Sequence, residues 1–215
     1  MFAMLVMELK EIYLFVRRNY EACLVISLAT IFLLLAKHHR LSELWLDSLF
    51  YYGVLPILSI VILLRKNPLH FGLRLGDYKV WGFHLLVSCP IVFLLIYLGV
   101  TTEAVQNYYR NRSSNFNPFL YMLEMAIQLW GWEFIFRGFM LFGLKDKLKE
   151  NAIFVQMIPF ALLHLGKPES ETISCIFSGI YFGYVCYRTN SFWPAYFLHC
   201  FINYATVFLV YFFYM

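Results

Sequence analysis

The sequence predicts an all-α protein, a polytopic transmembrane helical bundle of about seven to eight helices, for two reasons. Hydrophobic residues make up 61% of the 215 residues and charged residues only 14%, whereas an ordinary soluble domain has about 25% charged residues. The apolar residues also gather in runs long enough for a membrane-spanning helix, which needs about 20 residues. No polar stretch is long enough for a soluble domain, so we expect residues 1–215 to form a single membrane-embedded domain.

Residues 1–20 predict an amphipathic helix at the cytoplasmic surface of the membrane. This stretch has no basic residue before its first apolar run and no small-residue cleavage site before Arg17 and Arg18, so it is unlike a cleaved signal peptide. Seven apolar segments follow, and we expect each to be a helix: about 21–36, 44–64, 80–100, 118–144, 150–165, 171–187 and 191–214.

The fifth and sixth of these segments flank a polar turn, residues 166–171. The segment 150–165 is too short to cross a hydrocarbon core of roughly 30 Å at about 1.5 Å per residue. Polar backbone at membrane depth is tolerated where protein buries it or where it borders a water-filled cavity. The two segments therefore predict a hydrated cavity beside them. The Gly179-x-x-x-Gly183 spacing in the sixth segment favours close packing between helices.

The basic residues predict that the N-terminus is cytoplasmic. With that orientation, eleven basic residues lie in cytoplasmic segments and five in outer segments, in agreement with the positive-inside rule. We therefore expect an integral protein of a prokaryotic cytoplasmic membrane, with the lipid bilayer as a partner. No basic stripe interleaved with aromatic residues lies in a water-exposed segment, so nucleic acid is not an expected partner.

Glu133 and Arg137 stand out because they are charged residues inside a long apolar stretch. A charge at bilayer depth costs roughly 2.5–3.5 kcal/mol, so such residues are usually paired or functional. Their spacing of four places both side chains on one face of a helix, within reach of an ion pair. A structural ion pair that fixes the bundle is the simpler interpretation, and the sequence leaves it open.

Polar side chains on two further segments are expected at the same depth as this pair. One stripe of the last segment carries His199 and Asn203, and one face of the fifth segment ends at His164. Counted at about 1.5 Å per residue from the cytoplasmic ends, a layer about 10 Å thick holds Glu133, His164, His199 and Asn203. Side chains from three helices are therefore expected to converge on one site.

A carboxylate, two imidazoles and an amide supply what hydrolysis of a peptide bond needs. The carboxylate can deprotonate a water, one imidazole can orient that water or protonate the leaving amine, and the second imidazole with the amide can bind the oxyanion. A zinc ion held by Glu133, His164 and His199 is the alternative chemistry. No HExxH motif places two ligands on one helix face, so we expect no cofactor.

Three segments at these positions resemble the CPBP family, the CAAX-protease and bacteriocin-processing membrane proteins also called Abi. The family motifs are Glu-Glu-x-x-x-Arg, Phe-x-x-x-His and His-x-x-x-Asn, and here they read Trp132–Arg137, Phe160–His164 and His199–Asn203. The resemblance covers roughly residues 115–210, which we take as the catalytic core. It implies an all-helical intramembrane protease whose site opens toward the cytoplasmic side.

One residue departs from the family motif. Trp132 stands where the family has the first glutamate, its general base, so only Glu133 matches the pair. Glu133 is displaced from that position by about 100° around the helix, so it could serve as base only if the helix is rotated or if Arg137 faces elsewhere. Glu124 lies about 12 Å away along the helix, too far to substitute. Glu169 or Glu171, in the polar turn beside His164, is a better substitute.

The main hypothesis is an intramembrane endopeptidase that acts on a peptide or membrane-protein substrate, with or without an attached lipid. Its expected catalytic residues are Glu133 as base or base-positioner, Arg137 as its partner, His164 to orient water, and His199 with Asn203 for the oxyanion. The alternative is a non-catalytic membrane scaffold or immunity-type protein that keeps the fold after loss of the first glutamate. A transporter is disfavoured because the sequence shows no repeat.

Overall fold

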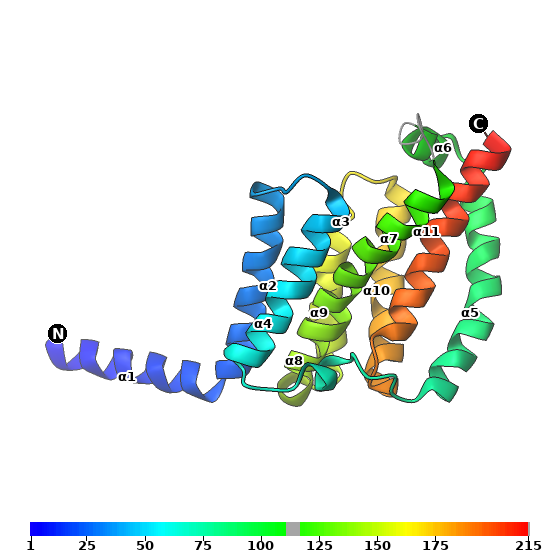
Figure 1. Ribbon diagram of the computed structural model, residues 1–215. Helices are drawn as coiled ribbons and strands as arrows, with labels where there is room; N and C mark the ends of the chain where they lie inside the picture. Colours follow the sequence, from blue (N-terminus) through cyan, green and yellow to red (C-terminus); the bar gives the residue numbers. More distant parts are fainter. Residues whose placement is uncertain (111–116, 215) are drawn as a thin grey trace.

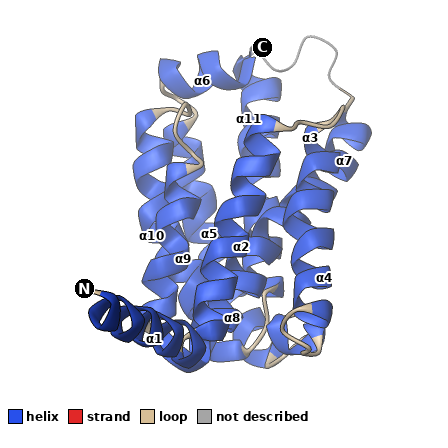
Figure 2. Cartoon of the chain, turned by 90° about the vertical axis from the view of Figure 1, so that its left-hand side faces the viewer, coloured by secondary structure: helices blue, strands red, loops and turns tan. Residues whose placement is uncertain are grey.

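The computed structural model describes residues 1–110 and 117–214, and regular structure in these ranges is helical apart from an isolated bridge between Leu165 and Lys167. The helices pack side by side as a bundle (Figures 1 and 2), which confirms the predicted all-α fold. In chain order the elements are α1 (Phe2–Arg18), α2 (Tyr20–His38), α3 (Leu44–Asp47), η1 (Ser48–Val54), α4 (Leu55–Ile62), η2 (Pro68–Phe71), α5 (Tyr78–Gly99), α6 (Glu103–Arg110), α7 (Pro118–Glu133), η3 (Phe134–Met140), α8 (Leu141–Leu148), α9 (Asn151–Leu162), α10 (Glu169–Thr189) and α11 (Trp193–Tyr214).

All seven apolar segments are helical, close to their predicted limits. The elements α3, η1 and α4 follow one another without a break, as do α7, η3 and α8. Within the described residues, four helices are long and apolar enough to cross a membrane: 20–38, 44–62, 78–99 and 193–214. The helix α9 has only 12 residues, so the prediction that the fifth segment is too short to span is confirmed.

Two short amphipathic helices lie outside the spanning segments. Helix α1 confirms the predicted N-terminal helix; it extends away from the bundle (Figure 1) and exposes apolar side chains such as Phe2 and Ile12. Its position at a membrane surface stays a prediction. Helix α6 was not predicted, because its sequence is polar and only eight residues long. Its apolar residues Val105 and Tyr109 are buried against Val100 and Val210, so tertiary packing stabilises it.

Helices α9 and α10 pack closely because glycines face α9. A Cβ at Gly179 would lie 2.8 Å from Cγ of Met157, and one at Gly183 would lie 2.6 Å from Nε2 of Gln156. That amide is fully buried and donates to the backbone carbonyl of Gly179 at 2.9 Å. The predicted role of the Gly179-x-x-x-Gly183 spacing is therefore confirmed, and this contact fixes the segment that leads to His164.

The long helix of residues 118–148 contains a π-helical segment at its most buried point. All seven residues of η3, Phe134–Met140, are buried, and the segment begins directly after Glu133. A π-helical turn holds one residue more than an α-helical turn, and such turns are frequent at functional sites. The wider turn changes the direction of every side chain that follows it. A regular 3.6-residue period therefore describes which way the side chains point as far as Glu133. Beyond Glu133 the side chains are rotated from the directions that this period predicts.

Candidate active site

A buried cluster joins Glu133, Arg137 and His199. The Oε1 atom of Glu133 lies 2.6 Å from Nδ1 of His199 and 3.3 Å from Nη1 of Arg137, and its Oε2 atom lies 3.1 Å from the same Nη1. Glu133 and Arg137 are 0% exposed, and His199 is 9% exposed. The carboxylate is thus enclosed by its two partners, with no exposed surface for an attacking water.

Arg137 lies in an aromatic cage rather than in a network of hydrogen bonds. The centre of its guanidinium is 3.8 Å from the ring centroid of Phe160 and 5.2 Å from that of Phe182. Among the described residues, no hydrogen-bond partner faces its Nε and Nη2 atoms. Cation–π contacts are strongest where the cation is desolvated. The cage and Glu133 therefore account for how a full positive charge is held in the core.

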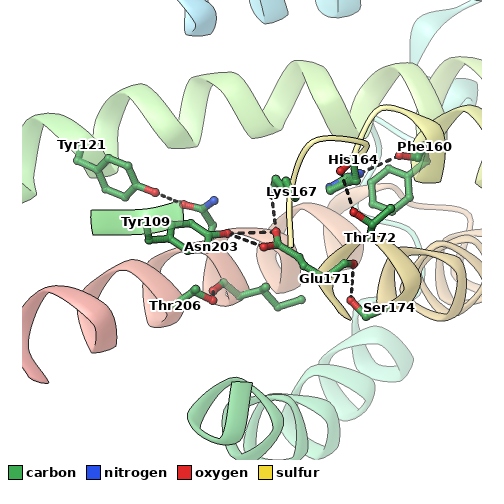
Figure 3. Close-up of polar contacts among 11 residues, drawn as sticks. Tyr109, Tyr121, Phe160, His164, Lys167, Glu171, Thr172, Ser174, Asn203 and Thr206 are labelled. Atoms are coloured by element: carbon green, nitrogen blue, oxygen red, sulfur yellow. Dashed lines mark hydrogen bonds and ion pairs between the residues drawn. The ribbon is translucent and has the colours of Figure 1, made fainter. Parts of the chain in front are cut away.

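His164 lies just beyond the last turn of α9, and its ring is held in one tautomer. Its Nδ1 atom is 2.8 Å from the carbonyl oxygen of Phe160, so Nδ1 carries the proton and Nε2 is left as the acceptor. The hydroxyl of Thr172, on α10, donates to the carbonyl of His164 at 2.9 Å (Figure 3). The ring centroids of His164 and His199 are 6.3 Å apart, with 29° between the ring planes.

A cavity of about 580 Å³ lies between these two imidazoles and the outer helices. Its walls come from α5, α6, α10, α11 and the end of α9, and both His164 and His199 line it. Much of the remaining wall is apolar, for example Leu95, Phe177 and Ile202. A cavity is therefore present beside the fifth and sixth segments, as predicted, and its hydration stays a prediction.

Asn203 is the one predicted site residue that lies apart from the others. It is one helical turn beyond His199 on α11 and is not among the residues that line the cavity. The hydroxyl of Tyr121, on α7, donates to its Oδ1 atom (Figure 3). The structure thus brings four of the five predicted residues together, and the fifth, Asn203, contacts α7 instead.

Trp132 fills the position of the missing glutamate and packs against the site. Its ring meets that of His164 edge to face, with centroids 5.7 Å apart, and that of Tyr52 at 5.9 Å. Its indole Nε1 is buried, and no hydrogen-bond partner faces it among the described residues. Trp132 does not line the cavity, so its role in the structure is to support the imidazole of His164.

The predicted substitutes for the lost glutamate differ in position. Glu171 lines the cavity, whereas Glu169 is exposed and does not. Both oxygens of Glu171 lie 3.1 Å from the hydroxyl of Tyr109, and Oε1 lies 2.5 Å from Nζ of Lys167 (Figure 3). The contact with Tyr109 spans 62 residues of sequence, which is why no local pattern could indicate it.

The zinc alternative does not fit the side chains as they lie. Glu133 and His199 direct a carboxylate oxygen and a ring nitrogen at each other, so neither atom faces a shared third position. Over residues 1–110 and 117–214, no three His, Cys, Asp or Glu residues form a group that could hold a metal ion.

One of three comparisons with known proteins found a match. Residues 114–205 match a family model described as type II CAAX prenyl endopeptidase Rce1-like. The matched segment is similar to this family and covers less than half of the chain. The Rce1-like segment contains all five predicted site residues and confirms the resemblance to the CPBP family. At family level it supports a CAAX protease-like intramembrane endopeptidase and an integral membrane protein. No curated protein and no solved structure matched the chain.

The cavity lies toward one end of the bundle, and the part of its wall on α5 and α6 comes from outside the matched segment. It is lined by the last turns of α5, by α6 and by the first half of α10, which lie at the end opposite α1 and α8 (Figure 1). The basic residues Lys145, Lys147 and Lys149 belong to the end that carries α8. If the basic end is cytoplasmic, the cavity end therefore lies on the outer side, unlike the cytoplasmic opening that the family resemblance implies.

Proposed function

We propose that the chain is an intramembrane endopeptidase that hydrolyses a peptide bond of a peptide or membrane-protein substrate with water. One observation carries the proposal. Two imidazoles from separate helices line the same cavity, and in each of them Nδ1 is held from behind, by Glu133 for His199 and by the Phe160 carbonyl for His164. In both rings, Nε2 is thereby left as the atom for the reacting groups.

The two imidazoles have different partners and therefore suit different tasks. In the reaction, His199 is the proton donor, with its Nδ1 atom held by the Glu133 carboxylate. Its Nε2–H can donate to the oxygen of the scissile carbonyl as that oxygen becomes negative, and then to the leaving amine. His164, backed by a neutral carbonyl, keeps an unprotonated Nε2 that accepts a hydrogen bond from the attacking water.

Glu133 acts in this proposal as a positioning residue. Its carboxylate fixes the ring of His199, and Arg137 holds the carboxylate in turn. Asn203 has only a secondary role as a donor, because its side chain lies outside the cavity wall. Its contact with Tyr121 fixes the amide. The apolar cavity suits a substrate segment from the bilayer, with or without a lipid chain.

Trp132 favours a second candidate function, a scaffold that has kept the fold without the reaction. The site lacks a carboxylate at position 132, and the neighbouring Glu133 is sealed from the cavity. A scaffold would keep its cellular phenotype when His164 and His199 are both replaced by Ala. An enzyme would lose the phenotype in that variant.

The proposed activity is tested with purified protein in proteoliposomes. Incubation with membrane-anchored peptides, some lipid-modified and some not, is expected to release two fragments. In ¹⁸O-labelled water, one labelled oxygen should enter the new carboxyl terminus, because water is the nucleophile; mass spectrometry measures both results. Peptides that all remain intact, with the doubly substituted His164→Ala/His199→Ala protein indistinguishable from the natural one in cells, would favour the scaffold.

We further propose the orientation that the basic residues indicate, with α1 and α8 toward the cytoplasm. An alkaline phosphatase fused to the C-terminus should then be active, because that end would lie outside, and a fluorescent protein fused to the N-terminus should fluoresce. The reverse pattern would place the cavity end in the cytoplasm, as the family resemblance implies, and would overturn the orientation without affecting the site.

A further inference from the structure

The cavity contains one carboxylate in the part of the chain that the structure describes, and it belongs to Glu171. Glu133 cannot meet a water in the cavity, since it is fully buried and held by His199 and Arg137. Trp132 offers no base, because an indole N–H is a donor only. A catalyst that uses water at this site needs a group that can accept a proton, and Glu171 shares the cavity with both imidazoles.

Glu171 keeps the capacity to accept a proton. An ionised carboxylate has about four lone-pair sites, and in Glu171 the contacts are one ammonium, from Lys167, and one hydroxyl, from Tyr109. Its side chain is 25% exposed, so water can reach it.

Glu171 is fixed relative to His164 through the backbone. The neighbouring residue Thr172 donates its hydroxyl to the carbonyl of His164 at 2.9 Å, and the backbone N–H of Lys167 donates to the same oxygen at 3.1 Å. The turn between α9 and α10 and the first turn of α10 therefore move with His164. A catalytic base must be held in a fixed position relative to the water, and any helix that reaches the site can hold it there.

We propose that Glu171 is the catalytic carboxylate of this chain, and that it has taken over on α10 the task of the motif glutamate that α7 has lost. This inference rests on the proposed function. Glu171 takes one proton from the water that His164 orients, while the water oxygen bonds to the scissile carbonyl carbon. The C–N bond then breaks, and the amine leaves with a proton from His199. A cavity water returns the proton of Glu171 to His199, so the cycle closes with one water consumed.

The test compares Glu171→Gln with a matched neighbour, Glu169→Gln, in the proteoliposome assay. Glu171→Gln should lower kcat at least 100-fold with KM changed less than threefold, because the amide keeps the shape but accepts no proton. Glu171→Asp should recover part of the rate. Glu169→Gln should act like the natural protein, since that side chain lies outside the cavity. Equal thermal unfolding midpoints show that the folds are intact.

Two further variants separate this inference from the function on which it rests. Tyr109→Phe removes one donor but leaves the carboxylate, so its rate should fall less than tenfold. If Glu171→Gln keeps more than half the natural kcat while His199→Ala is inactive, Glu171 is not the base and the peptidase proposal stands. If the natural protein cleaves none of the peptides, the function fails and this inference fails with it.

Discussion

Replacement of Arg137 by Met is expected to lower the free energy of unfolding by about 3–5 kcal/mol, the cost of leaving one partner of a buried ion pair alone. Arg137 is fully buried, and its Nη1 atom is within 3.3 Å of both oxygens of Glu133. Methionine fills much of the same volume among Phe160 and Phe182, so lost packing is a minor part of the effect. Unfolding of the purified protein in mixed micelles with increasing denaturing detergent measures the change.

A double variant shows whether charge is the cause. Glu133→Gln/Arg137→Met removes both charges, so it should recover most of the stability that Arg137→Met loses, because replacement of a whole buried pair by neutral groups is often nearly neutral. The same double variant should be inactive, since a neutral amide in place of the Glu133 carboxylate no longer fixes the ring of His199 in the same way. A single Arg137→Met variant within about 1 kcal/mol of the natural protein would contradict the paired charges.

Replacement of either cavity imidazole is expected to lower kcat/KM for peptide cleavage by about 10²–10⁴-fold, the range for loss of a general acid or base. His199→Ala removes the donor to the oxyanion and the amine, and His164→Ala removes the group that orients water. Both should leave the protein folded, because each imidazole faces the cavity on one side. Initial rates of fragment release, measured across substrate concentrations, give the ratio.

The matched control for these two variants is His84→Ala. His84 is another histidine in a predicted span and, unlike the two cavity histidines, is only half-buried; its Nδ1 atom lies 3.1 Å from the hydroxyl of Tyr181, and its side chain does not line the cavity. Its replacement should change the rate less than threefold. Equal losses in all three variants would show that a histidine in a membrane helix matters for folding alone, and would contradict the assigned roles.

The sequence predicted the helices well, because apolar runs of membrane-spanning length have few other solutions in a bilayer. It could not predict α6, an eight-residue polar helix held by Val105 and Tyr109 against distant side chains. The π-helical segment after Glu133 was equally hidden. That segment packs against η1 and α2, which are distant in the sequence, and no local pattern records such contacts.

The site was predicted in composition but not in the orientation of its side chains. Spacing correctly placed Glu133, His164 and His199 at one depth, because depth follows from the rise of each helix. Whether a carboxylate faces the cavity or turns behind it depends on rotation of each helix and on its partners. The burial of Glu133 and the contact between Tyr121 and Asn203 therefore appeared only in the structure.

The wall that α5 contributes to the cavity is one helix thick. Ser88 is the single buried residue of this 22-residue helix, so its other face is turned to the surroundings along nearly its whole length. A hydrocarbon chain in the surrounding leaflet and the imidazole rings are then neighbours across one layer of side chains. The cleavage rate is for this reason expected to depend on the lipid or detergent outside α5, as it depends on salt and temperature. Rates measured in different bilayers are therefore not directly comparable.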